Sequence, residues 1–279
     1  GLFRGDGLRY FFHAYLTSYA FYLSISLGAL FFVLVQHATR AGWSVTVRRL
    51  AEIFAGNIRL LIILFLPIIV PVLLGSHALY EWADPAAVAE DSLLQHKVPY
   101  LNLPFFGLRC VAYFAVWLWL SQYFLKRSTA QDESGDAELT LQMERLSPVG
   151  LILFALTVTF ASFDWLMSLA PQWFSTIFGV YYFSGALVGS LAVLILVGLG
   201  LQAAGRIGRE ITIEHYHDLG KLLFAFVVFW GYIAFSQYML IWYANIPEET
   251  VWYLARQTGP WVWVSLALLF GHLLIPFFG

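Results

Sequence analysis

The sequence predicts an all-α integral membrane protein, in which residues 1–279 form a single transmembrane helix-bundle domain with seven membrane-spanning helices. Composition is the first observation behind this prediction. Of the 279 residues, 60% are hydrophobic and only 11% are charged, whereas about 25% of the residues in a soluble domain are charged. The second observation is that the apolar residues form seven long runs, and a helix needs roughly 20 such residues to cross a bilayer.

These seven runs set the expected spans. Each run is too long and too continuously apolar for a strand, and a helix satisfies its own backbone hydrogen bonds in lipid. The expected spans are about residues 11–36, 50–74, 104–125, 147–169, 176–201, 218–243 and 260–278.

The loops between the runs alternate in charge, which predicts an orientation. The first, third and fifth loops carry most of the basic residues: Arg40, Arg48, Arg49, Lys126, Arg127, Arg145, Arg206 and Arg209. Lys and Arg accumulate in cytoplasmic loops, whereas Trp and Tyr gather at both membrane surfaces. We therefore expect these three loops in the cytoplasm and residues 1–10 on the opposite, outer side.

Asp164 follows sixteen residues, from Pro148 to Phe163, that carry no charge. It lies about 9 Å inside the outer end of its span, where an unpaired carboxylate costs about 2.5–3.5 kcal/mol. We therefore expect Asp164 to be paired, protonated or reached by water. Two roles remain open: a structural hydrogen bond to a neighbouring backbone group or tyrosine, and a proton-carrying or quinone-contacting group.

Four further polar residues are expected at the depth of Asp164 or near it. Gln237 and Tyr238 lie toward the outer end of the sixth span, and His13 and His77 lie near outer helix ends. Depth alone groups these residues with Asp164 as candidates for a quinol pocket. The alternative for each is local, as a hydrogen bond between helices or a polar group at the membrane surface.

A second polar set lies closer to the cytoplasm. Asn57 and Arg59 are in the inner half of the second span, and His272 is near the middle of the last one. Together with Asp164 and Tyr238 they are candidates for a proton path made of two half-channels. The alternative for Arg59 is that its long side chain reaches the membrane surface.

Other motifs give weaker indications. Cys110 is the single cysteine, whereas an iron–sulfur cluster is held by about four thiolates, and we expect no metal site. The net charge of −2 does not indicate a nucleic-acid partner. Gly185 and Gly189 have the GxxxG spacing, which favours close helix packing within the chain or with a partner subunit.

Three stretches resemble a known family. They are "HAYLTSYAFYLSISLGALFF" (13–32), "ASFDWLMSLAPQWFSTIFGVYYFSGA" (161–186) and "FWGYIAFSQYMLIWYANIPEETVWY" (229–253). They resemble the NrfD-like membrane subunits of alternative complex III, the second such subunit in particular, which are related to the membrane subunit of polysulfide reductase. The resemblance implies about ten helices in a bacterial inner membrane. Since the chain begins without methionine and ends in an apolar run, we expect it to be part of a longer protein.

The resemblance also implies a function. Alternative complex III oxidises membrane quinol, menaquinol or ubiquinol, and passes the electrons to cytochrome c or to a high-potential iron–sulfur protein. The implied partners are membrane lipid, a sister NrfD-like subunit, an iron–sulfur subunit, multihaem and monohaem cytochrome c subunits, and a terminal oxidase. The haem c and iron–sulfur clusters are then on partner subunits. This chain is expected to bear no cofactor and to supply a scaffold, a proton pathway and, as a further candidate role, quinol binding.

A second hypothesis comes from a different class. A secondary transporter that couples ions through Asp164 and Arg59 would also be an apolar helix bundle. Transporters often contain broken helices in paired positions of an internal repeat. Pro67 and Pro71 are positioned to kink the second span, but the sequence shows no paired counterpart and no repeat.

Overall fold

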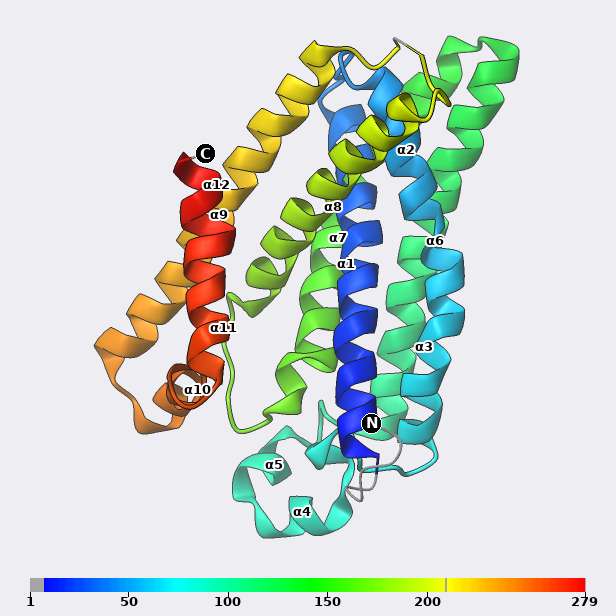
Figure 1. Cartoon of the computed structure of the whole chain (residues 1–279). Coiled ribbons are helices and arrows are strands. Elements are labelled where there is room, and N and C mark those ends of the chain that lie inside the picture. The colour runs from blue at the N-terminus through cyan, green and yellow to red at the C-terminus, as the bar shows by residue number, and fades with distance from the viewer. Residues whose placement is uncertain (1–7, 209, 279) are drawn as a thin grey trace.

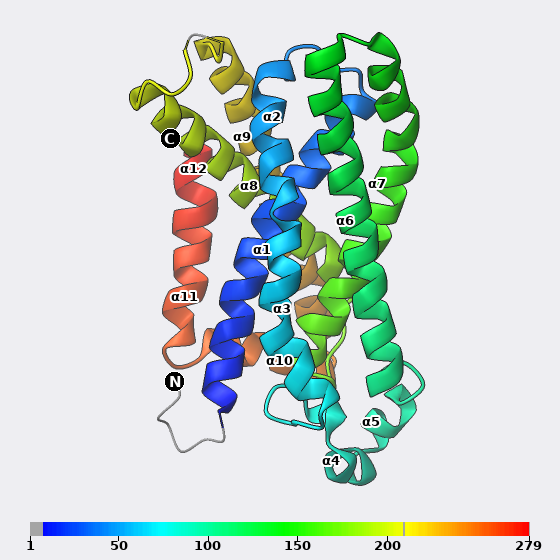
Figure 2. The same cartoon turned by 90° about the vertical axis from the view of Figure 1, so that its right-hand side faces the viewer.

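The computed structural model describes residues 8–208 and 210–278, so Arg209 lies outside the described residues (Figure 1). Its regular elements are all helical in this part of the chain, which confirms the all-α class. Seven helical stretches are long and apolar enough to cross a membrane, in agreement with the seven predicted spans. They run side by side as a bundle (Figures 1 and 2).

Several shorter helices join these long ones. The elements are α1 (Arg9–Ala38), α2 (Val45–Gly56), α3 (Ile58–Leu73), η1 (Glu81–Ala83), α4 (Pro85–Glu90), α5 (Ser92–Lys97), α6 (Leu103–Ser134), α7 (Ala137–Trp165), η2 (Met167–Leu169), α8 (Phe178–Ala203), α9 (Ile213–Ala244), α10 (Pro247–Gln257), α11 (Trp261–Ala267), η3 (Leu268–Leu274) and α12 (Ile275–Phe278). We call the end with the α1–α2, α6–α7 and α8–α9 connections the Arg-rich end. The other end, covered by α4, α5 and α10, is the capped end.

The third loop is much shorter than its polar sequence suggested. The expected loop over 126–146 was wrong, because α6 continues to Ser134 and α7 begins at Ala137. Gly135 ends α6 in the left-handed conformation, with φ of 67°, which glycine adopts without strain. The Asp136 side chain then accepts a hydrogen bond from the Glu138 backbone N–H at 2.9 Å and caps α7.

At the capped end, the connections fold into short helices of their own. Asp84 and Asp91 cap α4 and α5 by accepting backbone N–H groups. Pro247 begins α10, where its missing N–H costs nothing. Figure 1 shows α10 almost end-on and Figure 2 shows it from the side, so this helix lies across the end of the bundle.

Two spans contain irregular turns. A single residue, Asn57, separates α2 from α3 and accepts the N–H of Leu60 in the tighter 3₁₀ pattern, at 2.9 Å. The last span changes to a π-helix in η3, over Leu268–Leu274. Such wide turns are often found at functional sites.

The centre of the bundle is α1, which packs against α2, α3, α7 and α8. Its closest approach is to α8: an added Cβ at Gly28 would lie 2.5 Å from the Ala186 carbonyl oxygen and 2.6 Å from the Ser190 Cβ. Tyr182 of α8 also donates to the Ala20 carbonyl oxygen of α1 at 2.8 Å. Small residues allow this kind of contact between membrane helices.

The GxxxG pair of α8 is not the point of closest packing among the described residues. An added Cβ at Gly189 would have no atom within 4 Å, and one at Gly185 would only touch the Trp230 ring at 3.9 Å. The small-residue contact that the sequence suggested for this helix instead uses Ala186 and Ser190, against Gly28.

We predict that Gly28→Ala destabilises the bundle by about 1–3 kcal/mol, because the added methyl group forces α1 and α8 apart. Gly189→Ala is the matched control, and we expect it to leave the thermal midpoint in detergent unchanged. Equal midpoints for the two variants would contradict the close contact at Gly28.

Candidate functional site

The Asp164 carboxylate is fully buried, and it is paired with Arg109 of α6. Arg109 Nε donates to Oδ2 at 2.8 Å, and Nη2 donates to Oδ1 at 3.0 Å. The Tyr113 hydroxyl donates to Oδ2 as well, at 2.6 Å. A bidentate guanidinium–carboxylate contact is among the stronger hydrogen-bonded pairs. The expectation that Asp164 is paired, protonated or hydrated is therefore met by pairing.

The third nitrogen of the Arg109 guanidinium is also engaged. Nη1 donates to the Tyr100 carbonyl oxygen at 2.9 Å, and the guanidinium carbon lies 3.9 Å and 4.3 Å from the ring centroids of Tyr100 and Phe105. Burial, and then the Asp164 carboxylate, raise the pKa of the Tyr100 hydroxyl above its ordinary value. This tyrosine therefore stays a neutral phenol at physiological pH.

Neighbouring contacts extend this network to the capped end. The Trp165 indole N–H points at the Cys110 sulfur at 3.2 Å, and the Trp165 carbonyl oxygen accepts the Tyr80 hydroxyl at 3.1 Å. Tyr80 belongs to the connection after α3, so the cluster joins α6, α7 and that connection. This arrangement supports the structural role for Asp164, and its proton-carrying role stays a prediction.

Arg109 is the site residue that sequence reasoning missed. A signal for it was present: Arg109 lies inside the apolar run that begins at Leu103, and Tyr113 follows it by four positions. Residues four apart share one face of a helix. A charged residue inside a span usually has a partner, so Arg109 could have been matched with Asp164 from the sequence.

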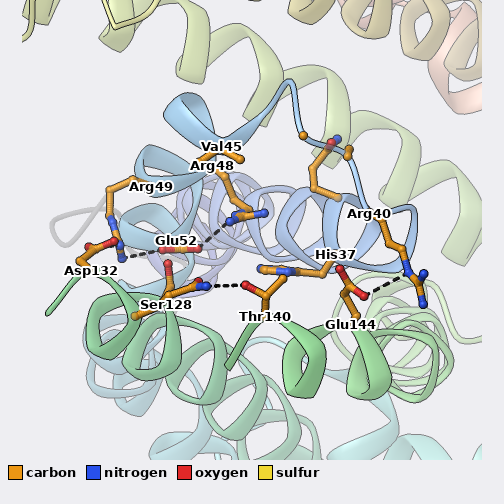
Figure 3. Close-up of a pocket in the computed structure, with 14 residues that line it drawn as sticks. His37, Arg40, Val45, Arg48, Arg49, Glu52, Ser128, Asp132, Thr140 and Glu144 are labelled. Atoms are coloured by element: carbon orange, nitrogen blue, oxygen red, sulfur yellow. Dashed lines mark hydrogen bonds and ion pairs between the residues drawn. The ribbon is translucent and has the colours of Figure 1, made fainter. Parts of the chain in front are cut away.

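A second site, which we call the polar cavity, opens at the Arg-rich end between α1, α2, α6 and α7 (Figure 3). Its volume is about 370 Å³. The lining residues are Gln36, His37, Arg40, Ala41, Gly42, Val45, Arg48, Arg49, Glu52, Ser128, Gln131, Asp132, Thr140 and Glu144.

Ion pairs line this cavity. Arg49 donates to Glu52 Oε2 at 2.7 Å and also contacts Asp132, so one arginine links α2 to α6. Arg40 pairs with Glu144 at 3.0 Å across the rim. The three arginines and three carboxylates of the lining balance in charge, and the cavity as a whole therefore favours neither an anion nor a cation.

Three buried side-chain atoms of the lining lack a hydrogen-bond partner. They are Gln36 Oε1, His37 Nε2 and Glu52 Oε1, in residues that are only 5%, 1% and 2% exposed. Arg48 Nε is 3.6 Å from Glu52 Oε1, beyond hydrogen-bond distance. Buried polar groups are normally satisfied, by water where protein groups are absent. The cavity has room for several water molecules of about 30 Å³ each.

The five quinol candidates lie in different surroundings. Asp164 is in the buried pair, His77 is exposed in the connection after α3, and the Tyr238 ring packs edge-on against Tyr253 at 5.0 Å. His13 and Gln237 line two separate cavities, and none of the cavities described contains two of the five.

The other proton-path candidates are also dispersed. Asn57 and Arg59 are exposed on the outside of the bundle. This exposure is compatible with an Arg59 side chain that reaches the membrane surface. His272 of η3 is half-buried, and its ring lies edge-on to Trp230 at 4.4 Å. Within the described part of the chain, no group of three or more His, Cys, Asp or Glu residues is placed to hold a metal ion.

Comparison with protein-family models finds no match for the chain, and comparison with curated proteins finds none either.

We predict that Asp164→Asn lowers the stability of the protein by about 3–5 kcal/mol, because it leaves the buried Arg109 guanidinium without a counter-charge. The double variant Arg109→Met/Asp164→Leu should recover much of that loss, because no unpaired charge then remains.

The control for this prediction is Arg145→Gln. It breaks the exposed Arg145–Glu138 pair and should cost less than about 1 kcal/mol. Thermal unfolding in detergent measures all three variants. If Asp164→Asn melts at the same temperature as Arg145→Gln, the buried pair does not hold α6 and α7 together.

Proposed function

We propose that the chain is a membrane subunit of a respiratory quinol:cytochrome c oxidoreductase of the alternative complex III type, in which it serves as scaffold and proton pathway. The observation that carries the proton-pathway part is the polar cavity, which leads from the Arg-rich end to His37 and Glu52. The resemblance of the three sequence stretches to NrfD-like subunits supports the remainder.

The chemistry of the polar cavity suits proton entry. Histidine and carboxylate side chains are the usual proton carriers in membrane proteins, and Glu52 lies about 10 Å along α2 from its first residue. His37, whose Nε2 has no hydrogen-bond partner, and Glu52, which is ion-paired with Arg48 and Arg49, both line this cavity. By the Lys/Arg rule the Arg-rich end is cytoplasmic, so the cavity would take up protons from the cytoplasm.

Quinol oxidation itself is better placed in the sister NrfD-like subunit. The quinol candidates of this chain do not share a cavity among those described, and Asp164, the carboxylate among them, is already bound by Arg109 and Tyr113. In this proposal the subunit provides the proton pathway and the scaffold of the complex. The partners that carry haem c and iron–sulfur clusters, and the bacterial inner membrane as location, belong to the same proposal.

One observation favours the transporter as a second candidate. The span of α2 and α3 is interrupted at Asn57, and the last span contains the π-helix η3. Broken spans line the substrate site in many transporters. In this chain, however, Asn57 is exposed on the outside of the bundle, so the interruption does not face a shared central site.

We predict that the protein, extracted from its native membrane in mild detergent through a tag, is accompanied by a multihaem cytochrome c and an iron–sulfur subunit. The visible spectrum should show c-type haem, and mass spectrometry should identify the chains. A colourless protein without such partners would overturn the proposal and bring the transporter forward.

We predict that Glu52→Gln and His37→Gln each lower proton-coupled turnover of the complex by about a hundredfold, the lower range for a positioned proton-transfer group. Both changes keep hydrogen-bonding ability and remove titration. The control is Glu138→Gln, at an exposed position near the start of α7. Proton uptake by quinol-driven proteoliposomes provides the measurement, with the thermal midpoint as a check on folding. Wild-type uptake in both variants would exclude the polar cavity as the proton entry.

A further inference from the structure

A second large cavity lies at the capped end, between α1, α5, η2 and α10. We call it the Trp173 cavity, and its volume is about 530 Å³. Half of its lining is apolar, from residues such as Leu169 and Val251. The polar and aromatic lining residues are His13, Gln172, Trp173, Glu248, Trp252 and Arg256.

One wall of this cavity is a three-layer stack. The rings of Trp173 and Trp252 are parallel, with centroids 4.0 Å apart and an interplanar angle of 8°. The Arg256 guanidinium carbon lies 3.2 Å from the Trp252 ring. Both neighbours are too close to share one face of Trp252, so the indole is held between them. This geometry fixes the guanidinium through a cation–π contact.

One hydrogen-bond donor of the stack lacks an acceptor, and the charge of Arg256 lacks an ion-pair partner among the described residues. Trp173 is 5% exposed, and its Nε1 has no hydrogen-bond partner. Arg256 donates to the Trp252 carbonyl oxygen at 2.7 Å but belongs to none of the ion pairs between described residues. Glu248 lies in the first turn of the same helix, eight positions earlier and about 12 Å away along its axis. Burial also lowers the pKa of Arg256.

A partly buried cation and an unpartnered indole N–H, which lie on opposite sides of the Trp252 ring, match an anion with several acceptor oxygens. Phosphate supplies such oxygens, and arginine is well suited to bind it. The apolar half of the lining, however, would make no favourable contact with a free phosphate ion. It suits a ligand whose anionic head continues into hydrocarbon.

The position of α10 agrees with such a ligand. The helix lies across the end of the bundle (Figures 1 and 2), and its Val251 and Leu254 side chains are each 61% exposed. Val251 and Leu254 lie three positions apart, on one face of the helix, and an exposed apolar face is typical of a helix at the level of lipid headgroups. We therefore expect the Trp173 cavity to open at the depth of the headgroup phosphates.

We propose that the Trp173 cavity binds the phosphate of an anionic phospholipid, with Arg256 and the Trp173 indole N–H as donors and the first part of an acyl chain along Leu169 and Val251. The site is independent of the proposed function, because it needs only a membrane protein and uses neither the polar cavity nor the Arg109–Asp164 pair.

Native mass spectrometry of the purified protein, titrated with phosphatidylglycerol, tests this site. Arg256→Gln should weaken binding roughly ten- to hundredfold, as expected for loss of a charged hydrogen bond. Trp173→Phe keeps an aromatic ring in the stack while removing the N–H with part of the ring system, and should weaken binding by about two- to tenfold. Arg206→Gln, an exposed arginine at the Arg-rich end, is the control that should change nothing.

Two further titrations distinguish the sources of the ligand. Zwitterionic phosphatidylcholine should bind more weakly than phosphatidylglycerol, and inorganic phosphate should not compete below high millimolar concentration. Competition by micromolar phosphate would overturn the lipid assignment in favour of a soluble anion. Unchanged phosphatidylglycerol affinity in both the Arg256→Gln and Trp173→Phe variants would overturn the site altogether.

Discussion

The bidentate contact between Arg109 and Asp164 is the interaction on which the capped half of the bundle depends. Neither charge is stable alone in a lipid-embedded helix, so α6 and α7 must meet at this depth and in this rotation. Tyr113, Tyr100 and the Trp165–Cys110 contact then fit around a pair that is already oriented. The charges contribute specificity more clearly than net stability, because a well-packed apolar pair of similar volume is often at least as stable.

The buried polar groups at the two ends of the bundle have different surroundings. At the capped end, the Asp164 carboxylate is bound by its neighbours and closed to water. At the Arg-rich end, His37 and Glu52 are equally buried but line an open cavity, and His37 Nε2 and Glu52 Oε1 have no hydrogen-bond partner there. Fully satisfied polar networks rigidify a protein, whereas unsatisfied buried groups are normally hydrated. The bundle therefore combines a closed polar network at one end with an open polar cavity at the other.

The sequence was sufficient for the spans because the length of an apolar run is a local property. The burial of Asp164 was predictable for the same reason, from the uncharged stretch before it. The partner of Asp164 was not identified, because Arg109 is 55 positions away. The sequence of one span does not determine which neighbouring helix a given side chain faces. The quinol candidates show the same limit: His13 and Gln237 were grouped by depth, and depth does not give rotation about the helix axis. The polar cavity was hidden because residues assigned to loops continue as helix in α2, α6 and α7.

The contact at Gly28 has a consequence for biogenesis. Gly28 and Ala186 are 158 positions apart in the chain, and a ribosome adds roughly 5–20 residues per second. After α1 enters the membrane, its small-residue face therefore waits about 8–30 s for α8 to emerge. During that interval the groove is open to lipid or to the insertion machinery. The late arrival of α8 would leave this face of α1 in need of protection while synthesis continues.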